Sequence, residues 1–375
     1  MKISIISMQR VCNFGSVLQA YSLKNILTGM GHEVSFVDYG IKEDDPIMLP
    51  QYAVRHSSER DGWSDSVIKR YLNKINRYMF NRLINRIKQN KQKTKLLNFQ
   101  QSTLKLNALD NNRQYDTCVI GSDEVFNCLQ GSYSHLVTQL LGNVTNAKNV
   151  ITYAASCGFT TYELLPQELK LKTSKALSNI TAFSVRDKNT KDFVQQLTGK
   201  QDIFMHFDPV LIGNFDSEVF ELKSYKKPRH KYCVVYSYAN RIHDTADINA
   251  IKEFCKRKHL KLIALGFQQT WIPNFMVTEP FELLYLINNA EFVITDTFHG
   301  TIFSAKYAER FAIIVRESNK NKLLDLVKKL EIDNHVLSDI NGLEAAYHIM
   351  NDKEKIKRIC EEERKQSIEY FEKYL

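Results

Sequence analysis

The chain has 375 residues, of which 43% are hydrophobic and 25% are charged, as is ordinary for a soluble globular protein. This length is sufficient for two domains, each with its own core. The opening residues, MKISIISMQR, hold too short an apolar run for a signal peptide, and no apolar stretch is long enough to span a bilayer. Seven scattered cysteines without a C-x-x-C pair favour neither a zinc site nor a disulfide framework, so we expect a cytoplasmic protein.

A formal net charge of +9 indicates an anionic partner, and much of this charge lies in a basic segment at about residues 64–98. Apolar residues recur in this segment at helical spacing, which predicts a helical insertion with a core-facing stripe. Its basic face is a candidate contact for anionic lipid headgroups at the inner face of a membrane. An ordinary solvated helix face is the alternative. Nucleic acid is not expected, because no recognised module or aromatic interleaving accompanies the charge.

The first 212 residues alternate strand and helix patterns, which predicts a Rossmann-like N-terminal domain. The first turn contains glycine but lacks the G-x-G-x-x-G fingerprint, so NAD binding is not inferred. The strands are expected at residues 2–7, 34–37, 115–120, 149–154 and 181–185, and the helices at 16–27 and about 163–177.

Residues 213–230 are polar and weakly periodic, which predicts an interdomain linker. A second Rossmann-like domain is expected at residues 231–345, and a charged C-terminal helix at residues 346–375. Two such domains would face a central cleft. The strands of the second domain are expected at residues 232–236, 260–265, 291–295 and 311–315, and its helices at 248–258 and 319–330.

The stretch around His299 is the leading candidate for a functional site. It would lie between the carboxyl end of a strand and the amino end of a helix, where open α/β sheets bind ligands. Free backbone N–H groups near Gly300 favour an anion, and a histidine beside an anion can act as an acid or base near neutral pH. A histidine that only caps or packs is the alternative.

Two other predicted strands end in residues suited to ligand contact. Ser122 and Asp123 follow one strand, and an ordinary capped turn is the alternative. Arg186 follows another and could hold a carboxylate or phosphate through two hydrogen bonds. A surface ion pair between Arg186 and Asp187 is the alternative.

Six fragments, taken in order, resemble one family, the polysaccharide pyruvyl transferases. Each fragment alone is weak, but their order along residues 2 to about 315 is specific. The fragments are NFGSVLQAY at residues 13–21, VIGSDEVFN at 119–127, YAASCG at 153–158, SVRD at 184–187, FDPV at 207–210 and TDTFHG at 295–300.

This resemblance implies a GT-B-like fold of two Rossmann-like domains. It implies transfer of the enolpyruvyl unit of phosphoenolpyruvate to a sugar of a bacterial-type surface polysaccharide or its lipid-linked precursor. The product would be a pyruvate ketal, with phosphate released and no metal or organic cofactor required. A nucleotide-sugar glycosyltransferase on the same fold and a non-catalytic protein that binds anions or membranes are the alternatives.

Within this hypothesis, His299 and Arg186 meet at phosphoenolpyruvate, with His299 as the acid–base group and Arg186 as an anion ligand. Asp123 is a candidate to orient or deprotonate an acceptor hydroxyl. Glu124 and Phe126 depart from the family pattern, which often has Gln and Trp there, and residues 330–335 lack an Arg that many relatives carry. The remaining predicted substrate contacts are Asn13, Gly15, Ser122, Ser156, Thr297 and Gly300.

Overall fold

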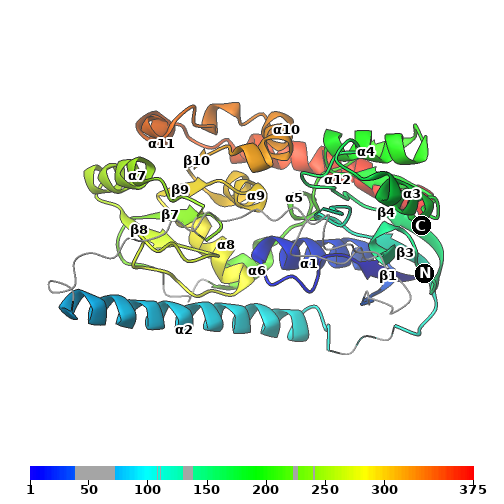
Figure 1. The fold of residues 1–375 in the computed structure, drawn as a ribbon, viewed down its shortest axis with the longest axis horizontal. Helices are drawn as coiled ribbons and strands as arrows, with labels where there is room; N and C mark the ends of the chain where they lie inside the picture. Colours follow the sequence, from blue (N-terminus) through cyan, green and yellow to red (C-terminus); the bar gives the residue numbers. More distant parts are fainter. Residues whose placement is uncertain (39–71, 108, 110, 130–137, 223–226, 240) are drawn as a thin grey trace.

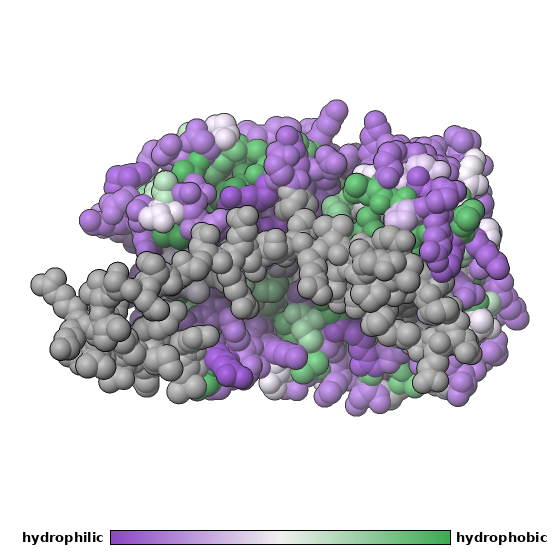
Figure 2. All heavy atoms as spheres, in the orientation of Figure 1, coloured by the Kyte–Doolittle hydropathy of each residue, from purple (hydrophilic) through white to green (hydrophobic). Residues whose placement is uncertain are grey.

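The computed structural model describes residues 1–38, 72–107, 109, 111–129, 138–222, 227–239 and 241–375 (Figure 1). Side chains of the long helix α2 are described from residue 84 onward. Figure 1 shows two α/β units side by side, with α2 along one edge of both. In the orientation of Figure 2, hydrophilic residues dominate the coloured surface, with smaller hydrophobic areas between them.

The N-terminal unit is built on a parallel sheet with strand order β2-β1-β3-β4. β5 and β6 pair in parallel with each other, and single bridges from Ile151 to Ala182 and from Ala155 to Val185 connect β5 to β4. Such sheets are buried on both faces, which accounts for the apolar runs in their strands. The elements are β1 (Lys2–Ile6), α1 (Phe14–Gly29), β2 (Glu33–Phe36), β3 (Tyr115–Ile120), β4 (Ala147–Thr152), α3 (Gln167–Leu177), β5 (Phe183–Val185), α4 (Lys188–Thr198) and β6 (Ile203–Met205).

The C-terminal unit contains a second parallel sheet, with strand order β10-β9-β7-β8. The central strands β7 and β9 are fully buried, and helices cover the sheet. The elements are β7 (Tyr232–Tyr236), α7 (Thr245–Arg257), β8 (Lys261–Ala264), α8 (Pro280–Asn288), β9 (Phe292–Thr295), α9 (Phe298–Tyr307), β10 (Phe311–Ile313), α10 (Lys320–Leu330) and α11 (Leu343–Tyr347).

Two short helices and the C-terminal helix connect the units. α5 (Pro209–Ile212) and α6 (Asp216–Glu221) lie between the sheets in sequence, so part of the predicted linker at 213–230 is helical. α12 (Lys353–Tyr374) returns to the first sheet, where the Tyr370 hydroxyl donates to main-chain oxygens of that unit. The expected C-terminal helix therefore begins later than predicted and serves as a brace between the two units.

Helix α2 (Leu72–Ser102) corresponds to the predicted basic helix, whose first residues lie outside the described part of the chain. Its end packs between the units, since the Phe99 ring lies 6.0 Å from Tyr21 of α1 and 5.5 Å from Phe281 of α8. The prediction of an entirely core-facing stripe is wrong at Ile87, which is 46% exposed. No helix among the described residues has the length and apolar character needed to cross a membrane.

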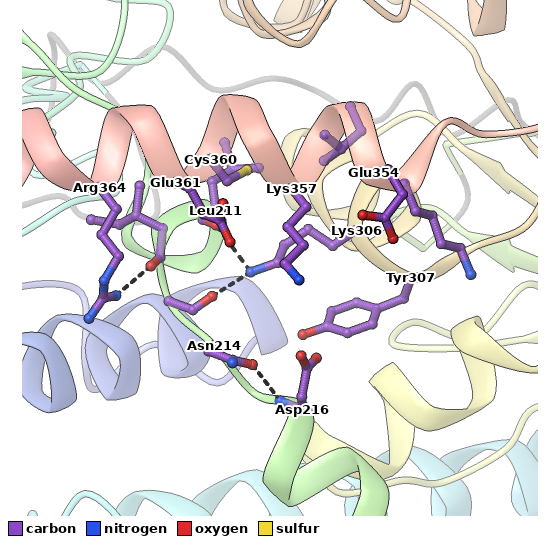
Figure 3. A pocket seen from close by; sticks show the side chains of 14 residues that line it. Leu211, Asn214, Asp216, Lys306, Tyr307, Glu354, Lys357, Cys360, Glu361 and Arg364 are labelled. Atoms are coloured by element: carbon purple, nitrogen blue, oxygen red, sulfur yellow. Dashed lines mark hydrogen bonds between the residues drawn. The ribbon is translucent and has the colours of Figure 1, made fainter.

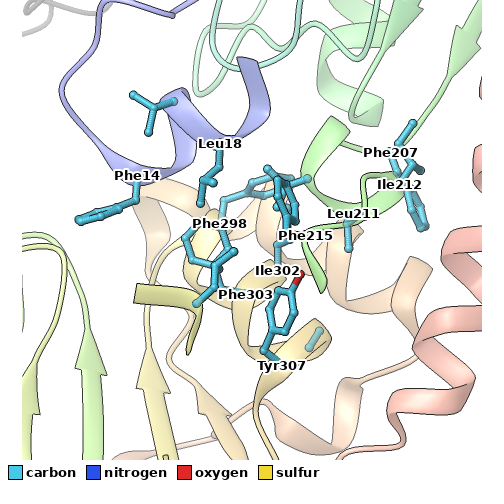
Figure 4. Close-up of a cluster of buried hydrophobic side chains, with 14 of the residues drawn as sticks. Phe14, Leu18, Phe207, Leu211, Ile212, Phe215, Phe298, Ile302, Phe303 and Tyr307 are labelled. Carbon is cyan, nitrogen blue, oxygen red and sulfur yellow. The ribbon is translucent and has the colours of Figure 1, made fainter. Parts of the chain in front are cut away.

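One hydrophobic cluster extends across both units (Figure 4). Phe14 and Leu18 of α1 approach Phe298 and Ile302 of α9, with α5 beside them. Burial of large aromatic and aliphatic side chains here stabilises the relative position of the two sheets. The start of α9, which carries His299, is therefore packed against the N-terminal unit.

Candidate active site

Helix α9 begins with a tightly specified turn after β9. The Thr297 hydroxyl accepts a hydrogen bond from Gly300 N at 2.9 Å and caps the helix. A Cβ on Gly300 would lie 2.1 Å from Thr295 Oγ1, so only glycine fits at this position. Thr297 and Gly300, both predicted substrate contacts, thus have a clear structural role in presenting His299.

His299 and Arg186 converge on one buried carboxylate, that of Asp208. His299 Nε2 lies 3.4 Å from Asp208 Oδ2 in a contact that lacks hydrogen-bond geometry. Arg186 Nη1 donates to the same oxygen at 2.9 Å, and Ser122 Oγ donates to it at 2.9 Å. Burial alone would raise the pKa of Asp208, but His299 and Arg186 outweigh burial and hold it well below its usual value.

Arg186 is buried, and its guanidinium carbon lies 4.1 Å from the centre of the Phe298 ring. Its Nε has no hydrogen-bond partner among the described residues. The proposed surface pair with Asp187 is not formed, because Arg186 pairs with Asp208 while Asp187 caps α4. The guanidinium is therefore fixed between the two units, with its Nε donor still unused.

His299 also contacts the first helix of the chain at Gly15. A Cβ placed on Gly15 would lie 2.2 Å from His299 Nδ1 and 2.3 Å from its Cγ. The imidazole consequently packs directly on the backbone at the start of α1. Asn13, the cap of that helix, accepts a hydrogen bond from Ser16 N at 2.7 Å. Gly15 thus forms the wall behind the histidine, and Asn13 caps the helix that carries this glycine.

Asp123 occupies the carboxyl end of the N-terminal sheet with a φ of +83°, in the left-handed region that is uncommon for residues other than glycine. Ser16 Oγ donates to Asp123 Oδ2 at 2.6 Å, and Ser156 N donates to its main-chain oxygen at 3.0 Å. Strained backbone of this kind concentrates at functional sites. Ser156 itself donates through its hydroxyl to Asp187 at 2.7 Å and lies deeper in the fold.

Glu124 pairs with Lys322 of α10 across the two units. Burial alone would raise the pKa of Glu124, but Lys322, Asn127 and Arg186 lower it to about 2. Asn127 Nδ2 also donates to Glu124 at 2.7 Å. Phe126 is fully buried in the hydrophobic core. Of the two departures from the family pattern, Glu124 is therefore the one placed between the units.

Asp208 caps the N-terminal end of α5, and contacts at the C-terminal end of this short helix hold it in place. Lys306 of α9 and Arg364 of α12 hold its last carbonyl groups, beside a cavity of about 470 Å³ (Figure 3). Burial lowers the pKa of Lys306 to about 8. The bonds are Lys306 Nζ to Val210 O at 2.8 Å, to Leu211 O at 3.1 Å and to Gly213 O at 2.5 Å, and Arg364 Nη1 to Ile212 O at 2.6 Å.

Sequence reasoning assigned no role to three residues of this arrangement, Asp208, Ser16 and Lys322. Asp208 lies within the fragment FDPV, and its place before proline marks it as a cap, but nothing local predicts its contact with His299. Ser16 lies within NFGSVLQAY. Lys322 lies beyond the matched fragments, and only the fold brings it to Glu124. The described residues contain no cluster of His, Cys, Asp and Glu suited to a metal ion.

Known structures share the overall fold at low sequence identity. UDP-N-acetylglucosamine 2-epimerase from Rickettsia bellii superposes with a TM-score of 0.50 at 10% identity, covering 100% of this chain and 96% of that one. The Neisseria meningitidis UDP-GlcNAc 2-epimerase bound to UDP-GlcNAc gives a TM-score of 0.46 at 11% identity, covering 100% of both chains. The Streptomyces sp. SF2575 glycosyltransferase SsfS6 gives 0.42 at 11% identity, covering 97% of this chain and 95% of that one.

The likeness to the Rickettsia bellii epimerase, together with the two parallel sheets, confirms a GT-B-like architecture of two Rossmann-like domains. No curated protein is similar enough in sequence to count as a match. A family model described as "Polysaccharide pyruvyl transferase" matches residues 13–318, which is most of the chain and includes all six fragments. The chain is thus a transferase that belongs to the polysaccharide pyruvyl transferase family.

Proposed function

We propose that the protein transfers the enolpyruvyl unit of phosphoenolpyruvate to a sugar of a bacterial-type surface polysaccharide or its lipid-linked precursor. The observation that carries this proposal is the shared contact of His299 and Arg186 with Asp208 Oδ2, at 3.4 and 2.9 Å. A histidine from one domain and an arginine from the other meet at one buried charge. Family membership supplies the reaction class, and the Arg186 guanidinium suits an anionic donor.

In the proposed reaction, a proton is added to the methylene carbon of phosphoenolpyruvate, while C2 accepts the oxygen of a sugar hydroxyl. The hydroxyl proton leaves as the new C–O bond forms. A second hydroxyl then attacks C2, the bond from C2 to the phosphate oxygen breaks, and the proton of this second hydroxyl passes to the departing phosphate, which yields a ketal and inorganic phosphate. No oxidant, metal or organic cofactor is required by this balance.

His299 is proposed to transfer the protons, because an imidazole can act as both acid and base and its Nε2 lies beside the Asp208 carboxylate. General acid–base help of this kind contributes about 10²- to 10⁴-fold in rate. Arg186 is proposed to bind the donor through its unused Nε, while Asp208 holds its other edge. Asp123, fixed by Ser16, is proposed to orient an acceptor hydroxyl.

The test combines phosphoenolpyruvate with a panel of glycan acceptors and follows both phosphate release and the added pyruvyl mass. We expect His299→Ala to lower turnover by at least about 10². His348→Ala is the matched control, since His348 is 69% exposed at the surface. Full turnover by His299→Ala would remove the histidine from the mechanism. Stabilisation by UDP- or GDP-sugars, with none by phosphoenolpyruvate, would indicate a nucleotide-sugar transferase instead.

We also propose that α2 touches a membrane surface that carries the acceptor. Its described outer face combines exposed Ile87 and Leu97 with the exposed basic residues Arg86, Lys91 and Lys93. Charge reversal at Lys91 and Lys93 should weaken sedimentation with vesicles that contain anionic lipid. The same change on the far side, at Lys365 and Lys373 of α12, serves as the control. Equal binding by both variants would exclude this contact.

A further inference from the structure

The motif that carries His299 also contains Asp296, a buried aspartate to which no role has been assigned. It follows β9 and has no solvent exposure. Neither of its carboxylate oxygens has a hydrogen-bond partner among the described residues. Burial raises the pKa of Asp296, although Arg241, Ser237 and Arg316 oppose this shift. A buried carboxylate without hydrogen bonds is costly, which points to a partner that is absent from the free protein.

Arg316 lies beside Asp296 with its own hydrogen-bonding capacity unused. Its Nε is 3.6 Å from Asp296 Oδ2, and its Nη1 is 3.9 Å from Asp247 Oδ2. Nε and Nη2 are both buried, and neither makes a hydrogen bond to a described residue. Arg241 also reaches this residue, since its Nη1 donates to the Asp296 main-chain oxygen at 3.4 Å. Donors and acceptors thus face each other without satisfying one another.

A ligand for this cluster must accept hydrogen bonds from a guanidinium and donate them to a carboxylate. A phosphate or carboxylate would satisfy Arg316 but would be repelled by Asp296 and Asp247. An ammonium group would satisfy Asp296 but would be repelled by the two arginines. A hydroxyl group does both, since it carries one donor and two acceptor sites. Two adjacent hydroxyls of a sugar match the paired oxygens of Asp296 and the paired nitrogens of Arg316.

An exposed aromatic ring lies next to the cluster. Tyr238 is 44% exposed, its ring centre is 4.9 Å from that of Phe267, and the Arg241 guanidinium lies 5.1 Å from it. An apolar ring beside convergent polar groups is the usual composition of a small-molecule site.

We propose that Asp296 and Arg316 bind a pair of adjacent hydroxyls of a hexose, and that Tyr238 packs against the sugar ring. The assignment of this hexose as the acceptor of pyruvyl transfer rests on the proposed function; its binding does not. The site follows the same strand as His299, so a sugar held there lies on the side of the C-terminal sheet where the proton-transfer group is found. Asp296 and Arg316 are positioning residues in this arrangement.

The test is saturation-transfer NMR of the full chain with methyl glycosides of glucose, galactose, mannose and N-acetylated hexosamines as probes. We expect at least one glycoside to bind, and Asp296→Asn and Arg316→Gln each to weaken it about ten- to hundredfold. Tyr238→Ala, at an exposed position where folding is not at stake, should weaken it as well. Asp192→Asn and Arg257→Gln, on the exposed surface, are the matched controls and should bind as the wild type does.

Wild-type affinity in Arg316→Gln and Tyr238→Ala would overturn the proposal, as would the failure of every glycoside to bind the wild-type protein. Mass spectrometry with phosphoenolpyruvate separates this result from the proposed function. Binding that depends on Asp296 but is never followed by pyruvyl addition would leave the sugar site standing and remove the pyruvyl transfer. Pyruvyl addition with an acceptor KM unchanged in Arg316→Gln would do the reverse.

Discussion

Substitution of Gly15 by alanine tests whether the imidazole must remain in its present place. The new Cβ would lie 2.2 Å from His299 Nδ1, 2.3 Å from Cγ and 2.7 Å from Cε1. Ordinary contact requires about 3.5 Å, so the ring must move by about 1.3 Å. The contact between His299 Nε2 and Asp208 Oδ2 is 3.4 Å long and is not expected to survive such a shift.

Misplacement of a reacting group by about 1 Å costs about 10² in rate, which is the loss of turnover that we expect for Gly15→Ala. The effect on stability should be smaller, because about 1–3 kcal/mol of overpacking is partly offset by the better helix propensity of alanine. Gly29→Ala, at the other end of α1, is the control, since a Cβ there meets no atom within 4 Å.

Two assays check this prediction. Phosphate release from phosphoenolpyruvate in the presence of an acceptor measures turnover, and the histidine ring resonances, assigned with His299→Gln, report the position of the imidazole without requiring activity. If Gly15→Ala retains both the His299 resonances and the turnover of the wild type, the inferred packing of the ring on α1 is wrong.

Three further predictions concern the surroundings of the site. Burial and Lys329 lower the pKa of His206 to about 4. Because the unfolded state binds the proton first, the unfolding free energy falls as pH drops from about 6.5 towards 4. Urea denaturation should show that His206→Gln removes about 2 kcal/mol of the difference in unfolding free energy between pH 7.5 and pH 5. Asp208→Asn should cost about 3–5 kcal/mol by leaving Arg186 buried without its partner, and the loss should shrink in the double variant with Arg186→Met; equal losses would refute the pairing. A double-mutant cycle of Glu124→Gln and Lys322→Gln should give a coupling free energy of about 1 kcal/mol at pH 7. Because the pKa of Glu124 is lowered from 4.5 to about 2, this coupling should disappear as pH falls through that range. Zero coupling at pH 7 would contradict the interdomain pair.

Much of the fold could be predicted from the sequence because parallel sheets leave a strong local signal. β3 and β7 lie where their apolar runs predict them, at Tyr115–Ile120 and Tyr232–Tyr236. The other predicted strands agree to within a few residues, since strand ends carry the weaker patterns. α4, α8 and β6 were not predicted. β6 has only three residues, Ile203–Met205, which is too short to leave a clear strand pattern, and its pairing with β5 arises from tertiary contacts.

In the candidate site, too, the features set by local sequence could be predicted and those set by tertiary contacts could not. The cap and glycine around His299 are local features, so their placement follows from the order Thr297-Phe298-His299-Gly300. Asp208 and His299 lie far apart in the sequence, and no periodicity connects the two. Pairing of this kind depends on how the two sheets dock, and that information is spread over the hydrophobic cluster that both units share rather than held in any motif.

The packing of the two units on each other explains how the four-residue helix α5 can hold the carboxylate of Asp208. α5 is too short to be stable alone, and its hydrogen-bonding groups require partners from elsewhere. Asp208 caps one end, and Lys306 of α9 and Arg364 of α12 hold the carbonyls at the other. Lys306 belongs to α9, the helix that also carries His299. Its bonds to α5 therefore tie the helix of the histidine to the helix that Asp208 caps. A variant such as Lys306→Met should therefore loosen the contact between His299 and Asp208 without touching either residue, whereas the loss of a merely peripheral lysine would leave the histidine resonances unchanged.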